Sequence, residues 1–256
     1  MLEQIKQIVR DASALMLTDT FEISSKEGYA NIVTSSDVAV QEYLRQHLSA
    51  LLPDSGFLCE EEDMHDLSHE YTWIIDPIDG TANYSRGIRE CAICVGLKHH
   101  SDMEIAVVYL PRTDEMFYAQ RGKGAWMNNR QIHVSNRPFE NSVLCTALAV
   151  YQKEHARVCS DIIVEAFLQC NDIRRFGAAA PELCYLALGH CELYFEYILS
   201  PWDFAAASLI LTEAGGVLSD LEGRPVDVTR PTGVLAANNQ ANQNRLVSIV
   251  QGVTNK

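Results

Sequence analysis

One segment of this chain constrains its fold and chemistry more than any other: the run WIIDPIDGT, residues 73–81. Its apolar start is typical of a buried β-strand that delivers Asp76 to the end of the strand. Pro77 has no N–H to donate, so we expect the sheet to stop there, and the following Asp79-Gly80 pair is typical of a turn. Because unpaired charge beside a hydrophobic core costs several kcal/mol, the two aspartates predict a cation that offsets them.

The composition indicates a large folded chain that disfavours polyanionic partners. Its 256 residues, 47% hydrophobic and 21% charged, are typical of globular proteins with a sizeable core. A formal net charge of −14 disfavours nucleic acid and anionic membranes as partners, and it repels an anionic substrate unless cations lie at the site. No apolar run approaches the ~18–20 residues of a membrane span, and the N-terminus lacks a signal-peptide pattern. We therefore expect a cytoplasmic protein without a membrane partner.

The cysteines and histidines give no strong metal or disulfide pattern. The 8 cysteines lie mostly in apolar segments, and Cys91 and Cys94 form a C-x-x-C within a predicted strand. Residues three apart in a strand point to opposite faces, so these two cysteines are not expected to share a metal or a disulfide. Five histidines show no ligand spacing on a helix face and are expected to be surface residues: His65, His69, His99, His100 and His133. The three tryptophans are expected in core or interface packing.

Hydrophobic periodicity predicts two layered halves, about 1–140 and 141–256, packed as a single domain over 1–256. The first half begins with helices over about 1–18 and 37–53, followed by a strand at 56–59 and a meander of strands at 91–98, 104–111 and 115–122. The second half alternates strands and helices in βαβ fashion: strands at 142–150, 172–177, 191–197 and 232–239, and helices over about 154–170, 178–189, 201–216 and after 239.

Acidic residues lie where predicted strands end or helices begin. Asp37 lies at the start of the second helix, Glu60 follows the strand at 56–59, and Asp203 lies at the start of the helix after Pro201. Taken singly, each has an ordinary explanation as a helix N-terminal acid or a solvated acidic loop. Together with Asp76 and Asp79 they form the set of hard oxygen ligands that suits Mg²⁺.

Four segments, in order along the chain, resemble the inositol monophosphatase family of Mg²⁺-dependent phosphomonoesterases. They are NIVTSSDVAVQ (31–41), FLCEEE (57–62), WIIDPIDGTANY (73–84) and WDFAAASLILTEAGG (202–216). The likeness covers essentially the whole chain. It implies an α/β fold of layered α+β type, an αβαβα sandwich with an antiparallel-rich N-terminal half and a βαβ-type C-terminal half. It also implies a homodimer and inhibition by Li⁺.

The resemblance implies two to three Mg²⁺ ions per active site. The first ion would be held by Glu60, Asp76 and the backbone carbonyl of Ile78. The second would be held by Asp76, Asp79 and Asp203, so that Asp76 bridges the pair. Glu60 would support a weaker third ion, mostly through waters. The metals would convert an acidic pocket into a receptor for an anion.

The resemblance also implies the catalytic and substrate-binding residues. Asp37 and Thr81 would orient and deprotonate the attacking water, with Glu60 acting through the third ion. Lys26 falls where the family carries a nearby lysine. Glu196 matches the acid that binds a substrate hydroxyl, and Ala179 belongs to the substrate side.

The turn after Asp79 has a chemical role that follows from the residues themselves. The backbone N–H groups of Gly80 and Thr81, at the start of a predicted helix, suit the oxygens of a phosphate. Gly80 is expected there because a side chain would block that approach.

The expected function is Mg²⁺-dependent hydrolysis of a small phosphate monoester, with inositol monophosphate as the expected substrate. Three other esters stay open: a sugar bisphosphate such as fructose 1,6-bisphosphate, histidinol phosphate, and a nucleotide 3′-phosphate. The segment TALAVYQKEH (146–155) lacks the Gly-Ser pair expected beside inositol, and Ala178 stands where a threonine is common. A non-catalytic regulatory binding protein on the same fold is the alternative from another class.

Overall fold

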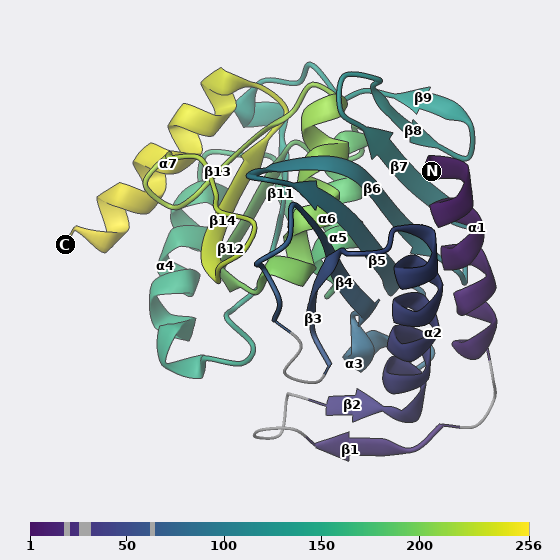
Figure 1. The fold of residues 1–256 in the computed structure, drawn as a ribbon. Coiled ribbons are helices and arrows are strands. Elements are labelled where there is room, and N and C mark those ends of the chain that lie inside the picture. The colour runs from purple at the N-terminus through teal and green to yellow at the C-terminus, as the bar shows by residue number, and fades with distance from the viewer. Residues whose placement is uncertain (18–20, 26–31, 62–64, 256) are drawn as a thin grey trace.

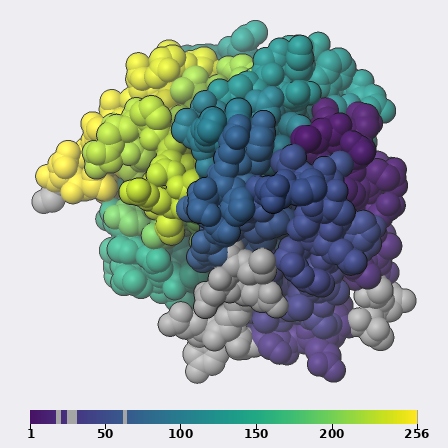
Figure 2. All heavy atoms as spheres, in the orientation of Figure 1, coloured from purple at the N-terminus to yellow at the C-terminus, as the bar shows by residue number. Residues whose placement is uncertain are grey.

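Two sheets and three groups of helices alternate in five layers in a computed structural model of the chain (Figure 1). The structure describes residues 1–17, 21–25, 32–61 and 65–255. The layers run α1 and α2, the larger sheet, α5 and α6, the smaller sheet, then α4 and α7. In Figure 2 the N-terminal helices and α7 accordingly lie on opposite sides of the molecule. The expected αβαβα sandwich is confirmed.

The larger sheet is a seven-stranded meander in the order β3-β4-β5-β6-β7-β8-β9, antiparallel except for the parallel β3–β4 pair. Its strands are β3 (Gly56–Cys59), β4 (Tyr71–Asp79), β5 (Ala92–His99), β6 (Asp102–Leu110), β7 (Glu115–Gln120), β8 (Ala125–Met127) and β9 (Arg130–Ile132). One face is covered by α1 (Leu2–Ala12) and α2 (Ser35–Leu51). A separate hairpin pairs β1 (Ile23–Ser25) with β2 (Ile32–Thr34), and α3 (Thr81–Tyr84) follows β4.

The smaller sheet has the order β11-β10-β12-β14-β13. Its strands are β10 (Val143–Thr146), β11 (Asp172–Arg174), β12 (Leu193–Leu199), β13 (Val217–Ser219) and β14 (Thr232–Ala237). β10 is parallel to both β11 and β12, as the expected βαβ pattern requires, and α4 (Ala156–Phe167) and α5 (Ala179–Ala187) make the connections. β14 is antiparallel to β12 and β13. The outer face is covered by α4 and α7 (Gln240–Thr254).

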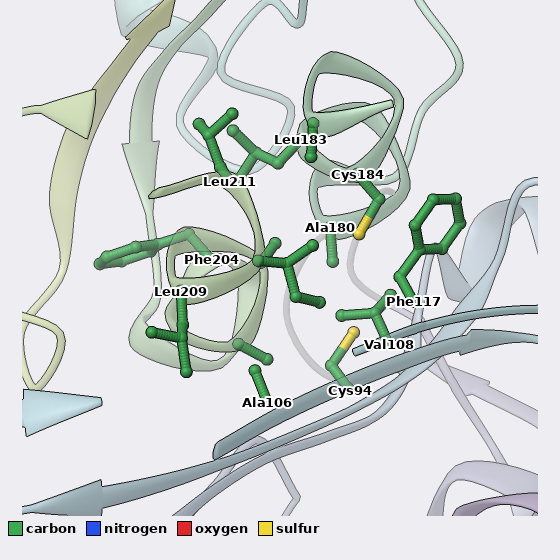
Figure 3. Packing of buried hydrophobic residues seen from close by; sticks show 14 of the residues in the cluster. Cys94, Ala106, Val108, Phe117, Ala180, Leu183, Cys184, Phe204, Leu209 and Leu211 are labelled. Carbon is green, nitrogen blue, oxygen red and sulfur yellow. The ribbon is translucent and has the colours of Figure 1, made fainter. Parts of the chain in front are cut away.

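Helix α6 (Pro201–Glu213) lies between the two sheets and is therefore apolar nearly all round. Figure 3 shows Phe204, Leu209 and Leu211 of this helix among side chains of α5 and of the larger sheet. Small residues let the backbones approach closely: a side chain at Gly96 of β5 would lie 3.6 Å from the Ala206 backbone. The tight packing fixes the start of α6, where Asp203 lies.

The structure corrects the expectation that Pro77 stops the sheet, since β4 continues through it to Asp79. The parallel neighbour β3 pairs only as far as Ile75, so that Pro77 lies beyond its end, and the pairing with β5 is irregular at the same place. A proline has no N–H to donate to a neighbouring strand. At such an irregularity no inter-strand hydrogen bond is needed from that position, so the strand can continue through it.

Other expectations are confirmed in outline. Each predicted helix and strand has a counterpart, although α1 ends at Ala12 rather than near 18 and α2 starts at Ser35. Cys91 and Cys94 belong to the cores on opposite faces of the larger sheet, as expected. Three short strands were not predicted: β8, β9 and β13. No helix in the described ranges is long and apolar enough to cross a membrane.

Candidate active site

An irregularity in β4 brings the two aspartates of the opening segment into one cavity. Asp76 pairs with Cys94 and Asp79 pairs with Ala92, so that β4 advances three residues while β5 advances two. In a regular strand, residues three apart point to opposite faces; the extra residue re-aims one of them. The Ile78 N–H donates to Asp76 Oδ1 at 2.9 Å. Both aspartates are buried and line the same cleft.

The Asp37 carboxylate and the Thr81 hydroxyl meet beside this irregularity. Thr34 caps α2, and its N–H donates to Asp37 Oδ2 at 2.8 Å, which holds Asp37 in the first turn. The other carboxylate oxygen, Oδ1, lies 3.0 Å from Thr81 Oγ1, which also lies 3.0 Å from the Ile78 carbonyl. Burial raises the pKa of Asp37, against the lowering effect of the Thr34 and Thr81 hydrogen bonds. The structure thus brings together the two residues expected to orient water.

Gly80 is required by its backbone conformation and by its protein neighbours. Its φ is +85°, in the left-handed region, and a Cβ atom would lie 2.9 Å from both the Ala178 Cβ and the Glu90 carbonyl. Neighbouring protein atoms therefore give a reason for the glycine that was not predicted. The helix after it, α3, has only four residues, so its dipole is small and phosphate binding at the Gly80 and Thr81 amides stays a prediction.

Asp203 reaches the cleft from the start of α6. Pro201 occupies the first turn, and the Ser200 N–H donates to Asp203 Oδ2 at 2.7 Å, a capping arrangement that fixes the carboxylate. Burial, followed by the charges of Asp79 and Glu60, raises the pKa of Asp203 well above its ordinary value. The Asp203 side chain thus belongs to the helix cap and also lines the cleft.

The acids of the cleft raise one another's pKa values. Burial, followed by the charges of Glu60, Asp79 and Asp203, raises the pKa of Asp76 well above its ordinary value. Burial also raises the pKa of Asp79 to about 7, although the Ala180 N–H donates to its Oδ2 at 2.6 Å. Buried carboxylates that face one another in this way fit a hard divalent cation such as Mg²⁺.

The donor set fits Mg²⁺ in its chemistry. Five acids line the cleft together with Ile78, and all of their donor atoms are oxygen: Glu60, Asp76, Asp79, Glu196 and Asp203. Within the described ranges, no three of these acids bring one oxygen each within 4.8 Å of one another. Bound Mg²⁺, which holds its oxygens at ~2.0–2.1 Å, would have to draw them closer together.

The cleft has a volume of about 340 Å³ and is open enough for a small ester. Its far wall is the segment 149–152, which includes Tyr151, a residue that is 70% exposed. Trp202 also lines the cleft, whereas packing alone was expected; its ring lies 5.9 Å from that of His65. Trp73 is fully buried, as expected.

The expected substrate side continues into a smaller cavity of about 100 Å³, where Glu196, Ala179 and Thr81 are all found. The Tyr194 hydroxyl donates to Glu196 Oε2 at 2.7 Å. Burial raises the pKa of Glu196 to about 7, while Tyr194 and the more distant Arg175 lower it. Ala179, the first residue of α5, is nearly buried and offers little more than its backbone.

Two groups near the substrate side, Glu182 and Tyr151, were not predicted from the sequence. Glu182 is buried in α5 and accepts hydrogen bonds from the Phe176 and Gly177 N–H groups at 2.6 and 2.9 Å; burial raises its pKa to about 8. Tyr151 was seen only as part of a segment that departs from the expected pattern. The one sequence signal for Glu182 was its position in the first turn of a predicted helix.

The expected lysine of the site, Lys26, lies outside the described residues.

His99 and His100 lie at the surface, as expected, with side chains 34% and 69% exposed. A ring nitrogen of each lies near Glu70, and one ligand atom from each of the three residues lies within 4.8 Å of the others. Spacing along the chain does not reveal this group, because Glu70 and His99 are adjacent only through the pairing of β4 with β5.

Known proteins resemble this chain in sequence and in fold. The sequence matches the inositol monophosphatase family over residues 2–255. It is 37% identical over 202 residues to "Nus factor SuhB" of Vibrio cholerae, covering 78% of this chain and 76% of that protein. The fold is similar to solved structures of the extragenic suppressor protein suhB from Bartonella henselae (TM-score 0.89, 30% identity, 97% of both chains) and of an IMPase from Thermotoga maritima (TM-score 0.87, 27% identity, 98% and 96%). The chain therefore belongs to the inositol monophosphatase family, which is magnesium-dependent.

Proposed function

We propose that this protein hydrolyses a small phosphate monoester to an alcohol and inorganic phosphate, and that inositol monophosphate is its substrate. The observation that supports this most is the buried group of acids around an open cleft, next to the Asp37–Thr81 hydrogen bond. Structural acids are seldom buried together without a cation, because each raises the pKa of the next. A cleft that holds them is a candidate for metal-assisted hydrolysis.

In this proposal the metal ligands are Glu60, Asp76, the Ile78 carbonyl, Asp79 and Asp203. Bound Mg²⁺ would supply charge stabilisation of the phosphoryl oxygens and a water of lowered pKa. The protein's task is then to fix these ligands, which it does through the β4 irregularity and the cap of α6.

Asp37 and Thr81 would orient the attacking water. With its proton directed to Asp37 Oδ1, the Thr81 hydroxyl presents lone pairs that can accept a hydrogen bond from water. Proton transfer from the water through Thr81 Oγ1 to Asp37 Oδ1 would leave hydroxide in position to attack phosphorus. The raised pKa of Asp37 makes its carboxylate a better base than an exposed aspartate.

Glu196 supports a substrate rich in hydroxyl groups. A carboxylate next to the cleft can accept hydrogen bonds from ring hydroxyls, and its pKa of about 7 keeps part of it charged near neutral pH. A second anionic group placed against this side chain would be repelled. These points favour an uncharged polyol ring at this position.

A bisphosphate is the second candidate substrate, supported by a cavity beside the cleft that contains two arginines. A shallow cavity of about 280 Å³ lies next to the substrate side and is lined by Arg86 and Arg175. Among the described residues, these two are the charged groups of its lining, and neither forms an ion pair with a described carboxylate. A phosphate remote from the reacting one could be placed there.

A binding role is the third candidate. The name Nus factor SuhB, carried by the Vibrio relative, is not that of a phosphatase, so the expectation that nucleic acid is excluded as a partner is not supported. Three apolar side chains are exposed on and beside α4: Val164, Phe167 and Leu168. Such a patch favours a protein partner, and we propose that this partner is a second copy of the chain. The number of Mg²⁺ ions, Li⁺ inhibition and a cytoplasmic location remain proposals.

Phosphate release from a panel of esters distinguishes these candidates. Myo-inositol 1-phosphate, fructose 1,6-bisphosphate, histidinol phosphate and 3′-phosphoadenosine 5′-phosphate would be compared with Mg²⁺ and then with EDTA. We expect fast, Mg²⁺-dependent release from the inositol ester. Release from the bisphosphate alone would instead favour a bisphosphate substrate whose second phosphate binds near Arg86 and Arg175. No release from any ester, by protein shown to bind Mg²⁺, would contradict the enzymatic proposal and favour a binding role.

A further inference from the structure

Three potential metal ligands meet at the end of β4 and β5 remote from the cleft. Glu70 directly precedes β4, His99 is the last residue of β5, and His100 begins the turn to β6. His99 Nε2 lies 2.8 Å from Glu70 Oε1, and His100 Nε2 lies 3.8 Å from the same oxygen. Asp76 lies six positions after Glu70 along the strand, which is about 20 Å at ~3.3 Å per residue. This group is therefore independent of the acids of the cleft.

The surrounding structure holds the three side chains in place. The His100 N–H donates to the Glu70 carbonyl at 2.9 Å, and the Lys98 ammonium group donates to the His100 carbonyl. The Tyr71 ring stacks on His99 with centroids 4.4 Å apart and planes 10° apart. His100 has a φ of +53°, uncommon for a residue with a side chain, and its ring centroid lies 4.3 Å from that of His99. Both imidazoles thus lie beside Glu70 in the folded chain.

We propose that Glu70, His99 and His100 form a site for a divalent transition metal, with Zn²⁺ as the ion that fits best. Two imidazoles and one carboxylate suit Zn²⁺, Cu²⁺ or Ni²⁺, whereas Mg²⁺ prefers an all-oxygen set. Tetrahedral zinc, with bonds of ~2.0–2.1 Å, places neighbouring ligand atoms about 3.3 Å apart. The observed separations of 2.8 and 3.8 Å lie on either side of that value. The ligand atoms of all three residues lie within 4.8 Å of one another, so they can fill three of the four positions.

A water molecule is the expected fourth ligand. The nearest other acid along the pairing, Asp102, lies opposite His99 in the β5–β6 pair. Its carboxylate is 2.9 Å from Arg121 and is therefore already engaged, so it is not expected to be the fourth ligand. The site is open to solvent, since the side chains of Glu70 and His100 are 60% and 69% exposed. An ion can therefore reach it in the folded protein. Once bound, the ion would join the start of β4 to the β5–β6 turn, so metal is expected to raise the melting temperature.

Zinc titration of the full chain in excess Mg²⁺ tests the site. Mg²⁺ competes for the oxygen ligands of the cleft, and binding is followed by calorimetry and by competition with a chromophoric zinc chelator. The wild type is expected to bind one Zn²⁺ that Mg²⁺ does not displace, and His100→Ala is expected to weaken binding by about tenfold or more. Co²⁺ in place of Zn²⁺ should give the absorption of a tetrahedral rather than an octahedral ion.

His69→Ala is the matched control. His69 is also a partly exposed histidine beside a carboxylate, Asp66 at 3.2 Å, but it lies outside the three-residue group. Zinc affinity should be unchanged in this variant. Glu70→Gln keeps a hydrogen-bond acceptor for His99 while removing the charge, so it should fold and bind zinc more weakly. Melting temperatures in EDTA report on folding.

Equal zinc affinity in the wild type, His100→Ala and Glu70→Gln would overturn the proposal and leave His99–Glu70 as a surface ion pair. Complete displacement of zinc by Mg²⁺ would overturn it as well, because the zinc would then occupy the cleft. Neither result depends on phosphatase activity.

Discussion

The two ends of β4 hold ionisable groups in opposite surroundings. At the end of the strand Asp76 and Asp79 are 1% and 7% exposed, and burial raises the pKa of both. At the start, Glu70 is 60% exposed and lies beside two histidines. Burying like charges together is unfavourable unless a cation joins them. The free energy needed to bury these carboxylates therefore indicates by itself that the end of β4 is a functional site. The exposed end carries no such cost, and its affinity for metal has to come from ligand type and geometry.

Removing a charge from the buried end should have the largest effect. Asp203→Asn keeps the acceptor that the Ser200 N–H uses but loses the charge of a proposed metal ligand, so Mg²⁺-dependent turnover should fall by about a thousandfold. The free energy of unfolding in EDTA should rise at the same time, because one of several repelling carboxylates is gone. Phosphate release and denaturant unfolding measure the two effects.

Asp161→Asn provides the control, since it makes the same chemical change on the exposed surface of α4. Both activity and stability should stay near those of the wild type. A loss of stability in Asp203→Asn would instead show that the helix cap outweighs charge repulsion, and would weaken the contrast between the two ends of β4.

Loss of the Thr81 hydroxyl should be the next largest effect. Thr81→Val keeps the shape of the side chain but removes the group that lies 3.0 Å from Asp37 Oδ1. Turnover should drop by about a hundredfold, within the usual range for proton transfer, while Mg²⁺ affinity is retained. Thr81→Ser restores the hydroxyl and should recover most of the activity. If Thr81→Val turned over at the wild-type rate, the proposed path through Thr81 Oγ1 would be wrong.

Glu196→Gln should change substrate binding rather than catalysis. A carboxylate that accepts hydrogen bonds from ring hydroxyls contributes roughly 1–2 kcal/mol, so KM for myo-inositol 1-phosphate should rise about tenfold with little change in kcat. p-Nitrophenyl phosphate has no ring hydroxyls, and its KM should not increase. Equal changes in KM for both esters would remove Glu196 from the hydroxyl-binding role.

The pH dependence of stability tests the buried acids without a substitution. Asp79 and Glu196 have folded pKa values of about 7, above their ordinary values of 3.8 and 4.5. Between pH 4 and 7 the folded state therefore binds more protons than the unfolded state, so the free energy of unfolding should fall as pH rises. Urea unfolding in EDTA at several pH values checks this, and Mg²⁺ should flatten the decline. A rise in stability over the same range would contradict the assigned shifts.

Sequence patterns predicted the layers and the acids because both depend on local signals. Apolar periodicity identified the helices and the longer strands. Pro77 and Gly80 directly follow Asp76 and Asp79, and Pro201 lies two residues before Asp203; proline and glycine mark the ends of elements. β8, β9 and β13 were missed because three residues hold too little of an alternating pattern. Pro77 was misinterpreted because the pairing partners of β4 are not visible in its own sequence.

Contacts between distant segments could not be predicted from spacing. Glu182 faces the substrate side through the packing of α5, and the Glu70–His99 pair exists only because β4 and β5 are antiparallel. The close approach of Ala178 and Glu90 to Gly80 could not be predicted either, since both come from other parts of the chain. Residue types indicated the chemistry, and topology decided which residues meet.

The most direct test of the account is the Mg²⁺ dependence of phosphate release from myo-inositol 1-phosphate, measured for the wild type and for Asp76→Asn. Asp76 is the residue proposed to bridge two ions, and its change to asparagine removes charge without altering size. We expect saturable activation of the wild type by Mg²⁺, and no activation of the folded variant at any concentration. Mg²⁺-independent release, or wild-type activation of Asp76→Asn, would contradict the claim that the buried acids of the cleft hold the catalytic metal.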